Sequence, residues 1–304
     1  MVKDFLSLIK PHGIDVRQNE ILKKYTTLNI GGAAKFFVNV NNLLQLKTVL
    51  KIANECREEI LVIGAGSNML ISDNGFDGVV IKLRGEFSNF YIMDNNVVSY
   101  SGVMLPFLIK TTVDYSLGGL EELFGIPGSI GGAIMMNAGT KTSTISDNLD
   151  YIEVIEITNP DKVIKLTKNE INFGYRKSGL EGFIIVKAAF ILRKSDKDIL
   201  KKRITEILIE RNKTQPLGTF NVGCVFKNPQ DGKISSAKLI ESCGLKGFFC
   251  GDAYVSEKHA NFIINRQNAT SEDFVKVIRH VIKTVKEKYN IELEPEIKLI
   301  NIQL

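Results

Sequence analysis

Gly125-Ile126-Pro127-Gly128-Ser129-Ile130-Gly131-Gly132-Ala133-Ile134-Met135-Met136-Asn137-Ala138-Gly139 is the stretch that decides the fold. Five of its fifteen residues are glycine, and none carries a charged side chain. Glycine allows positive φ and close approach of a ligand to the main chain, and successive unhindered N–H groups form a concave anion site. The stretch therefore indicates a site for a phosphate-bearing cofactor. The alternative is a tight loop packed against its own protein.

A second small-residue loop, Gly64-Ala65-Gly66-Ser67-Asn68, follows a short apolar run that is typical of a buried strand. A dinucleotide-binding Rossmann turn would need a third glycine at the position of Met69, and the breakers at residues 73–75 argue against a helix there. We therefore expect a loop that contacts a phosphate by its N–H groups, without a Rossmann helix.

Three further sites could carry chemistry. Arg176, in Tyr175-Arg176-Lys177-Ser178, could bind a carboxylate bidentately, with a surface ion pair as the alternative. Cys224, in Gly223-Cys224-Val225-Phe226-Lys227-Asn228-Pro229, could give a proton to a carbanion, because an ordinary thiol titrates near pH ~8.5. A buried, inert thiol is the alternative. One carboxylate of Glu294-Pro295-Glu296 could take part in proton transfer if it faced a cleft, or both could simply be exposed.

Composition excludes several classes. The chain has 304 residues and a formal net charge of +5, with no basic stripe interleaved with aromatics, so nucleic acid is not an expected partner. No window reaches the roughly 20 apolar residues of a membrane span, and the first ten residues lack the apolar core of a secretory signal. A cytoplasmic protein is expected. The four cysteines form no metal-binding pattern, so neither a disulfide framework nor a metal site is predicted.

The order of apolar patterns predicts mixed helices and strands. Helices are expected over residues 42–55, 105–115 and 235–243, after a cap at Ser195 with Asp198, and after a cap at Thr270 or Ser271. A polar segment, 211–215, follows the Ser195 helix. Strands are expected over residues 59–63, 79–83, 96–101, 151–157, 162–166, 183–192, 261–264 and 296–302.

Taken together, these motifs resemble those of the UDP-N-acetylenolpyruvoylglucosamine reductase (MurB) family. The resemblance covers nearly the whole chain and includes two more motifs, Thr26-Thr27-Leu28-Asn29-Ile30-Gly31-Gly32 and His259-Ala260-Asn261. It implies an α+β fold with a two-lobed FAD-binding region of the vanillyl-alcohol-oxidase (PCMH) type over residues 1–200. The lobes would span roughly 1–82 and 83–200. A C-terminal α+β substrate-binding domain, 201–304, would follow.

The resemblance also implies two half-reactions. NADPH would reduce non-covalently bound FAD, and the reduced flavin would pass hydride to the methylene carbon of UDP-N-acetylglucosamine enolpyruvate. Proton donation to the neighbouring carbon would then give UDP-N-acetylmuramate, a peptidoglycan precursor. A monomer is expected, with no nucleic-acid or membrane partner.

Matched residue by residue, the resemblance implies that Arg176 and Glu296 stabilise the enolic intermediate. The implied substrate contacts are Tyr175, Lys227 and Asn228. The implied cofactor contacts are Gly64, Ala65, Gly66, Ser67, Asn68, Met69, Gly128, Ser129, Gly132, Ala133 and Asn137.

Cys224 departs from the family pattern, because the family's proton donor is commonly a serine. A thiol is a much stronger acid than a hydroxyl, so donation remains chemically reasonable, although a thiolate would have no proton to give. The short interval between Arg176 and Cys224 indicates the type without the tyrosine-bearing insertion. Two alternatives stay open, namely another flavin-dependent oxidase or dehydrogenase on the same fold, and a non-catalytic UDP-sugar or nucleotide binder.

Overall fold

The computed structural model describes residues 4–304, and the described chain divides into two compact units. The first unit contains residues 4–18, Lys35–Ala65 and Asp77–Ile209. The second unit contains Asn19–Ala34, Gly66–Phe76 and Glu210–Leu304. Each unit is therefore assembled from three separate segments of the chain.

One sheet of the first unit has four strands in the order β1-β2-β5-β3. Their bounds are β1 Asp15–Ile21, β2 Ala33–Val40, β3 Glu59–Val62 and β5 Phe76–Leu83. β3 pairs with β5 in parallel. The helices α1 (Phe5–Ile9) and α2 (Leu43–Cys56) pack on one another. Their buried side chains join those of β2 and β5 in one apolar cluster.

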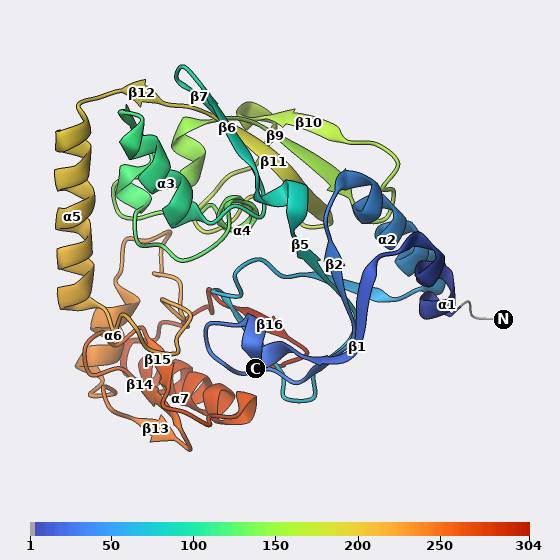
Figure 1. Cartoon of the computed structure of the whole chain (residues 1–304). Helices are drawn as coiled ribbons and strands as arrows, with labels where there is room; N and C mark the ends of the chain where they lie inside the picture. Colours follow the sequence, from blue (N-terminus) through green and yellow to red (C-terminus); the bar gives the residue numbers. More distant parts are fainter. Residues whose placement is uncertain (1–3) are drawn as a thin grey trace. The chain divides into compact units, whose positions relative to one another are not determined.

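The other sheet of this unit has five antiparallel strands in the order β10-β9-β11-β7-β6 (Figure 1). Their bounds are β6 Phe90–Met93, β7 Asn96–Tyr100, β9 Leu149–Glu156, β10 Ile164–Thr167 and β11 Phe183–Ile191. α4 (Ile130–Met135) packs on β7 and β11. α3 (Leu105–Asp114) reaches β6 through Phe107 and Phe90, whose ring centroids are 5.8 Å apart. The two helices and this sheet share a second apolar cluster.

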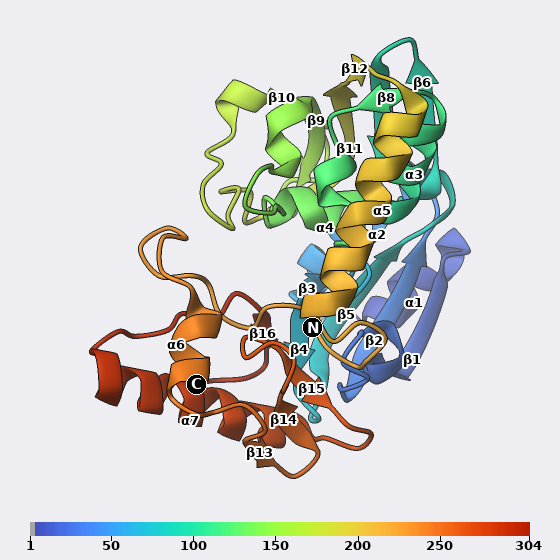
Figure 2. The ribbon, with the colours of Figure 1, turned by 90° about the vertical axis from the view of Figure 1, so that its left-hand side faces the viewer.

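The second unit has its own core, built around α6 (Ser236–Ser242) and α7 (Ser271–Tyr289). α7 packs against a three-stranded antiparallel sheet, which Figure 2 shows beside the helix. The strands are β13 Phe249–Cys250, β14 Ala253–Val255 and β15 Ile263–Asn265. β4 (Met69–Ile71) pairs in parallel with β16 (Lys298–Ile300). This pairing joins an early segment of the chain to its last strand.

Short elements complete the described chain. β8 (Leu117–Gly118) pairs with β12 (Arg193–Lys194). The 3-10 helices are η1 Lys10–His12, η2 Leu22–Tyr25, η3 Gly85–Ser88, η4 Glu121–Leu123, η5 Ile145–Asn148 and η6 Lys168–Glu170. Within residues 4–304, no helix is both long and apolar enough to cross a membrane.

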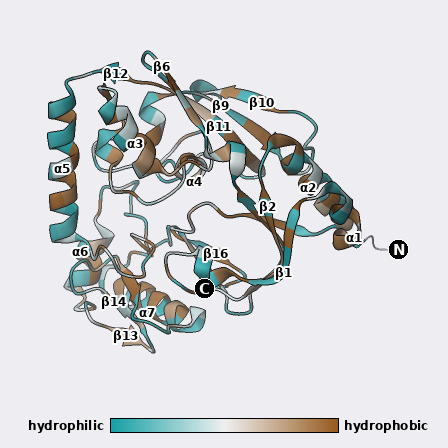
Figure 3. Cartoon of the chain, in the orientation of Figure 1, coloured by the Kyte–Doolittle hydropathy of each residue, from teal (hydrophilic) through white to brown (hydrophobic). Residues whose placement is uncertain are grey.

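Most predicted elements are confirmed, including the helix at residues 42–55, observed as α2, and the helix capped by Thr270, observed as α7. The side chain of Thr270 accepts a hydrogen bond from Asp273, and Asp273 bonds back to Thr270, which completes a capping box. Buried apolar residues line one face of α7, and its lysines and Arg279 are exposed, as the two colours along the helix in Figure 3 illustrate.

Both predicted boundaries of the helix after residue 195 are wrong. Asp196, and not Ser195, caps α5 (Lys197–Thr214), because its Oδ1 accepts hydrogen bonds from the backbone N–H groups of Asp198 and Ile199. The helix also continues through residues 211–214, which were expected to lie outside it. α5 is mostly hydrophilic (Figure 3), with Leu200 as its buried residue. The weak apolar pattern explains why sequence placed its end too early.

The last strand is shorter than the predicted 296–302. Glu294, Pro295 and Glu296 lie before β16, and Pro295 forms an isolated antiparallel bridge with Phe226. Proline has no backbone N–H to donate, so it seldom continues a ladder. The candidate carboxylate of Glu296 is therefore placed by a single bridge and not by a regular strand.

Candidate active site

The glycine-rich stretch forms a loop that leads into α4. The side chain of Ser129 caps this helix by accepting a hydrogen bond of 3.4 Å from the backbone N–H of Gly132. Two glycines are required by close approach. A Cβ at Gly131 would lie 2.8 Å from the Cβ of Ser101, and a Cβ at Gly64 would lie 2.6 Å from Oγ of Ser129. The two predicted cofactor loops therefore touch at Gly64 and Ser129.

A cavity of about 150 Å³ lies where these loops meet in the first unit. Gly64, Ser129 and Gly132, all predicted cofactor contacts, are among the residues that line it. The remaining lining residues are Val62, Ile63, Lys82, Leu83, Ser101, Gly102, Met104, Gly131, Met135, Phe183, Ile184 and Ile185. We call this space the glycine-loop cavity. It suits part of a ligand, because whole ligands of cofactor size occupy some 300–1,000 Å³.

The glycine-loop cavity contains a polar atom that needs a partner. Ser101 is only 3% exposed, and its Oγ has no hydrogen-bond partner within residues 4–304. Asn137, on the same stretch as Ser129, presents a similar case, because its Oδ1 is buried without a partner there. Buried polar atoms are nearly always hydrogen-bonded in folded proteins. These two atoms fit a bound group that has both donors and acceptors, as FAD does.

Arg176 lies in a two-residue turn of the first unit. Gly174 and Lys177 exchange backbone hydrogen bonds of 3.0 and 3.3 Å around Tyr175 and Arg176. Arg176 has φ of +57°, a left-handed conformation that is uncommon outside glycine. Its guanidinium carbon lies 5.2 Å from the centre of the Tyr175 ring.

Two side chains attach this turn to the glycine-rich stretch. Nδ2 of Asn137 donates to the carbonyl of Gly174 over 3.0 Å, and Oγ of Ser178 donates to the carbonyl of Met135 over 2.8 Å. Sequence placed Asn137 and Arg176 in separate motifs. The structure shows that the first motif supports the second.

The second half of the Gly64 loop belongs to the second unit, where the segment after Gly66 forms β4 and not a Rossmann helix, as expected. A Cβ at Gly66 would lie 2.0 Å from the carbonyl oxygen of Tyr25, and Gly66 has φ of +65°, so glycine is required. Nδ2 of Asn68 donates to the carbonyl of Glu296 over 3.3 Å, and the Asn68 carbonyl accepts from the N–H of Lys298. A predicted cofactor contact and a predicted catalytic residue are thus neighbours.

Val225, the residue after Cys224, lies beside Glu296 along the main chain of the second unit. The N–H of Glu296 donates to the carbonyl of Val225 over 2.7 Å, and the N–H of Lys227 donates to the carbonyl of Glu294 over 2.9 Å. The structure therefore brings two segments far apart in sequence, 224–227 and 294–296, side by side.

The predicted substrate contacts of the second unit already have protein partners. Nζ of Lys227 forms an ion pair of 2.5 Å with Oε1 of Glu294. Oδ1 of Asn228 accepts a hydrogen bond of 2.9 Å from the N–H of Ser236, which begins α6. Asn228 therefore also fixes the loop to a helix, a role that its motif did not reveal.

Asn261, in the family motif His259-Ala260-Asn261, holds the Cys224 loop in place. Its Oδ1 accepts from the N–H of Phe226 over 2.9 Å, and its Nδ2 donates to the carbonyl of the same residue over 2.8 Å. Its own carbonyl accepts from the N–H of Val225. Asn261 is 2% exposed. Burial lowers the pKa of the neighbouring His259.

Two charged residues escaped the sequence prediction. Arg211, in the last turn of α5, has a buried Nε with no hydrogen-bond partner within the described chain. Burial lowers the pKa of Arg211, and the charge interaction with Cys224 raises it. The two side chains therefore interact electrostatically. Lys82 lines the glycine-loop cavity. In the sequence, Lys82 is a lysine within the apolar run of β5, and Arg211 is an arginine in a polar segment. Neither pattern distinguishes a site residue from an ordinary surface charge.

Arg176 belongs to the first unit, and Cys224 and Glu296 to the second. Residues 4–304 contain no group of three or more His, Cys, Asp or Glu side chains able to hold a metal ion, and their four cysteines form no disulfide.

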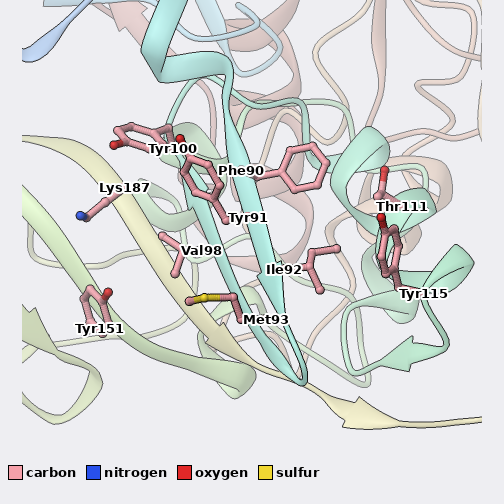
Figure 4. Close-up of a pocket in the computed structure, with 10 residues that line it drawn as sticks. All are labelled: Phe90, Tyr91, Ile92, Met93, Val98, Tyr100, Thr111, Tyr115, Tyr151 and Lys187. Carbon is pink, nitrogen blue, oxygen red and sulfur yellow. The ribbon is translucent and has the colours of Figure 1, made fainter.

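A larger hollow of about 660 Å³ lies elsewhere on the first unit, over β6, β7 and the end of α3. Figure 4 shows its aromatic and aliphatic lining, with Lys187 as its charged residue. Lys187 forms an ion pair of 3.0 Å with Glu153. No predicted site residue lines this hollow, so its size does not make it the candidate active site.

Comparisons with known proteins identify the family to which the chain is similar. A family model described as "FAD binding domain" matches residues 34–161, and one described as "UDP-N-acetylenolpyruvoylglucosamine reductase, C-terminal domain" matches residues 215–300. The chain is 39% identical over 301 residues to the UDP-N-acetylenolpyruvoylglucosamine reductase of Thermotoga sp. (strain RQ2), which covers 98% of each protein. It is 38% identical over 288 residues to that of Clostridium novyi (strain NT), covering 94% of this chain and 92% of the relative.

A solved structure is similar over the same length. The crystal structure of UDP-N-acetylenolpyruvylglucosamine reductase (MurB) from Thermus caldophilus superposes with a TM-score of 0.82 at 34% identity. The match covers 94% of this chain and 99% of that one. The identities, their coverage and the two matching domain models show that the chain belongs to the UDP-N-acetylenolpyruvoylglucosamine reductase family.

Proposed function

We propose that this chain catalyses the FAD-dependent, NADPH-consuming reduction of UDP-N-acetylglucosamine enolpyruvate to UDP-N-acetylmuramate in peptidoglycan precursor synthesis. Relatives that carry the reductase name match 98% of the chain, and this family uses FAD and NADPH. The observation that carries the proposal is the side-by-side packing of segments 224–227 and 294–296, with Asn68 bonded to Glu296.

FAD supplies the hydride when it is bound in its reduced form. We propose that its contacts are Gly64, Ala65, Gly66, Ser67, Asn68, Met69, Gly128, Ser129, Gly132, Ala133 and Asn137. Support comes from the glycine-loop cavity, which Gly64, Ser129 and Gly132 line, and from the buried partnerless Oδ1 of Asn137. A non-covalent mode of binding is part of the proposal.

The chain's own residues would manage the charge and the proton. When hydride adds to the methylene carbon of the substrate, negative charge develops on the adjoining carbon and its carboxylate. The guanidinium of Arg176 would stabilise that charge through its fixed positive charge, and Glu296 would stabilise it by donating a hydrogen bond in its protonated form. The Cys224 thiol would give its proton to the carbon and become a thiolate.

Tyr175, Lys227 and Asn228 are proposed substrate contacts. The Lys227 side chain is 24% exposed, and its partner Glu294 is 68% exposed, so an anionic substrate group could replace the glutamate as the ion-pair partner. Surface ion pairs contribute only about 0–1 kcal/mol, and such an exchange would therefore cost little.

The domain assignment is also proposed, with an FAD-binding region over 1–200 and a substrate-binding domain over 201–304. A monomer working in the cytoplasm completes the proposal. Sedimentation of the holoenzyme tests the oligomeric state, and fractionation of the native cell tests the location.

Stopped-flow absorbance of the purified yellow protein tests the function. NADPH should bleach the flavin, and UDP-N-acetylglucosamine enolpyruvate should restore its colour without oxygen. Bleaching that only oxygen reverses would favour an oxidase. A colourless protein, or one that no reductant bleaches, would favour a non-catalytic binder.

A further inference from the structure

We propose that Lys82 is a cofactor-binding residue whose ammonium group faces the diphosphate of FAD in the glycine-loop cavity. The inference rests on the proposed function, because it assumes that FAD binds through the glycine loops. It goes further by assigning a charge to a part of the site for which the motifs supply only backbone groups and serines.

The position of Lys82 ties it to both glycine loops. Lys82 lies near the end of β5, and its Nζ donates a hydrogen bond to the carbonyl of Gly64, which lies against Ser129. An ammonium group has three N–H donors. Among the described hydrogen bonds, the Gly64 carbonyl accepts one of them, so two remain for a ligand.

The lining of the cavity explains why a ligand should use those donors. Lys82 is the charged side chain among the described lining residues, which are otherwise apolar, glycine or serine. Ser101, 3% exposed, contributes a second polar group whose Oγ lacks a partner within residues 4–304. A half-buried cation and a buried, partnerless hydroxyl in one small cavity are most simply satisfied by an oxyanion.

The local charges point to an anion as well. Burial, together with the positive charge of Arg84 just beyond the end of β5, lowers the pKa of Lys82 to about 8. Nε of Arg84 is itself held by Oδ1 of Asn39 on β2. The segments that line the cavity from β3, α4 and β11 bring apolar, glycine and serine residues toward Lys82. A bound diphosphate would supply the missing negative charge and raise the pKa of Lys82.

This coupling makes FAD affinity depend on pH. Below about pH 8 the lysine is already charged before FAD binds. Above that pH the apoprotein must take up a proton to form the ion pair, so affinity falls as the pH rises. A lysine that merely supports the Gly64 carbonyl would affect stability and would not distinguish ligands that carry phosphate from ligands that lack it.

The experiment titrates apoprotein with FAD, ADP and riboflavin by calorimetry between pH 6.5 and 9.5. The Kd for FAD and ADP should rise on the order of tenfold between pH 7.5 and 9.5 in the unmodified protein. Riboflavin has no phosphate and should show no such rise. Lys82→Met should weaken the binding of FAD and ADP on the order of tenfold at pH 7.5 and remove the rise of their Kd with pH. The matched control is Lys110→Met, which changes an exposed lysine.

Lys82→Arg keeps a positive charge at every pH used, so it should bind FAD without the pH-dependent rise. This variant keeps the test decisive if circular dichroism shows that Lys82→Met does not fold. Equal Kd values and equal pH slopes for the unmodified protein and Lys82→Arg would overturn the inference while leaving the proposed function intact. Failure of the unmodified protein to bind FAD at any pH would overturn both.

Discussion

At the scale of single residues, Cys224 is the proposed proton donor of the substrate half-reaction. Its loop is fixed by Asn261 and by the bridge to Pro295, so a substitution there should change chemistry more than structure. Cys224→Ala should leave flavin reduction by NADPH within about twofold and slow the substrate half-reaction by roughly 10²–10⁴, the usual contribution of a general acid. Stopped-flow absorbance separates the two steps.

Two further variants complete that experiment. Cys224→Ser should retain part of the second half-reaction, because a hydroxyl can also donate. Cys250→Ala, another cysteine of the second unit, should behave as the unmodified protein. A full second half-reaction in Cys224→Ala would remove the thiol from the mechanism.

Arg176 supports a prediction about the geometry of charge. A lysine keeps the charge but not the planar fork that binds a carboxylate bidentately, so Arg176→Lys should lower kcat on the order of 10²-fold. Steady-state kinetics of Arg176→Lys and of the exposed neighbour variant Lys177→Ala measure the effect. Equal kcat values for these two variants would count against a catalytic role for the guanidinium.

Arg211 supports a prediction about the reactivity of Cys224. The two side chains interact electrostatically, and a nearby cation favours the reactive thiolate. Arg211→Met should therefore slow alkylation of Cys224 by iodoacetamide at pH 7 by about threefold or more. Mass spectrometry of the Cys224 peptide gives the rate, with exposed Arg279→Met as the control. An unchanged rate would mean that Arg211 does not act on the sulfur.

Sequence identified the residues that lie in motifs and missed those that act from outside them. Arg176, Cys224 and Asn137 stand among glycines or small polar residues, which mark a loop chemically. Lys82 and Arg211 stand in a strand and a helix, where their neighbours in sequence say nothing about a cavity or a thiol. Only the fold brings Lys82 to Gly64 and Arg211 to Cys224.

At the scale of elements, α5 is attached to the first unit by a bidentate ion pair. Nε and one Nη of Arg203 bond to the two carboxylate oxygens of Glu122 over 2.6 and 2.7 Å. Glu122→Gln should lower the free energy of unfolding by about 1 kcal/mol at pH 7, since Glu122 is 26% exposed and Arg203 43% exposed. Urea unfolding measures it, with exposed Glu210→Gln as the control.

The same pair predicts how stability changes with acid. Hydrogen bonds from Arg203 hold the pKa of Glu122 below its ordinary value of 4.5, against the opposing effect of burial. Because the pKa of Glu122 is lower in the folded protein than in the unfolded chain, the ionised carboxylate stabilises the folded protein at pH values above the unfolded pKa. This stabilisation is lost as the pH falls below about 4.5. Glu122→Gln should therefore lose less stability than the unmodified protein between pH 7 and pH 3. Parallel acid profiles would exclude this contribution.

Elements with a strong apolar period were predictable, and elements with a weak one were not. α7 repeats buried residues on one face and has a capping box, so both its start and its period were readable. α5 has one buried side chain, and its residues 211–214 look like a polar loop. The bridge of Pro295 to Phe226 gives no local signal at all, because it depends on chain segments far apart in sequence.

At the scale of the whole molecule, β16 should matter more than its three residues suggest. It is the partner of β4, and Ser72 beyond β4 donates to the carbonyl of Ile300. Removing residues 298–304 should lower Tm on the order of 5 °C or more, because the loss of several kcal/mol shifts Tm by a few degrees per kcal/mol. Removing only residues 303 and 304 is the control. An unchanged Tm in the longer deletion would show that β4 needs no partner.

The pairing of Met69 with Lys298 also constrains how the protein is made. Translation proceeds from the N-terminus, so β4 leaves the ribosome long before its hydrogen-bonding partner exists. The second unit can close only after residues 298–300 have been made, whereas residues up to Ile209 already include the segments of the first unit. Nascent chains stalled before β16 should accordingly expose the edge of β4 to chaperones, even when the first unit has become resistant to protease.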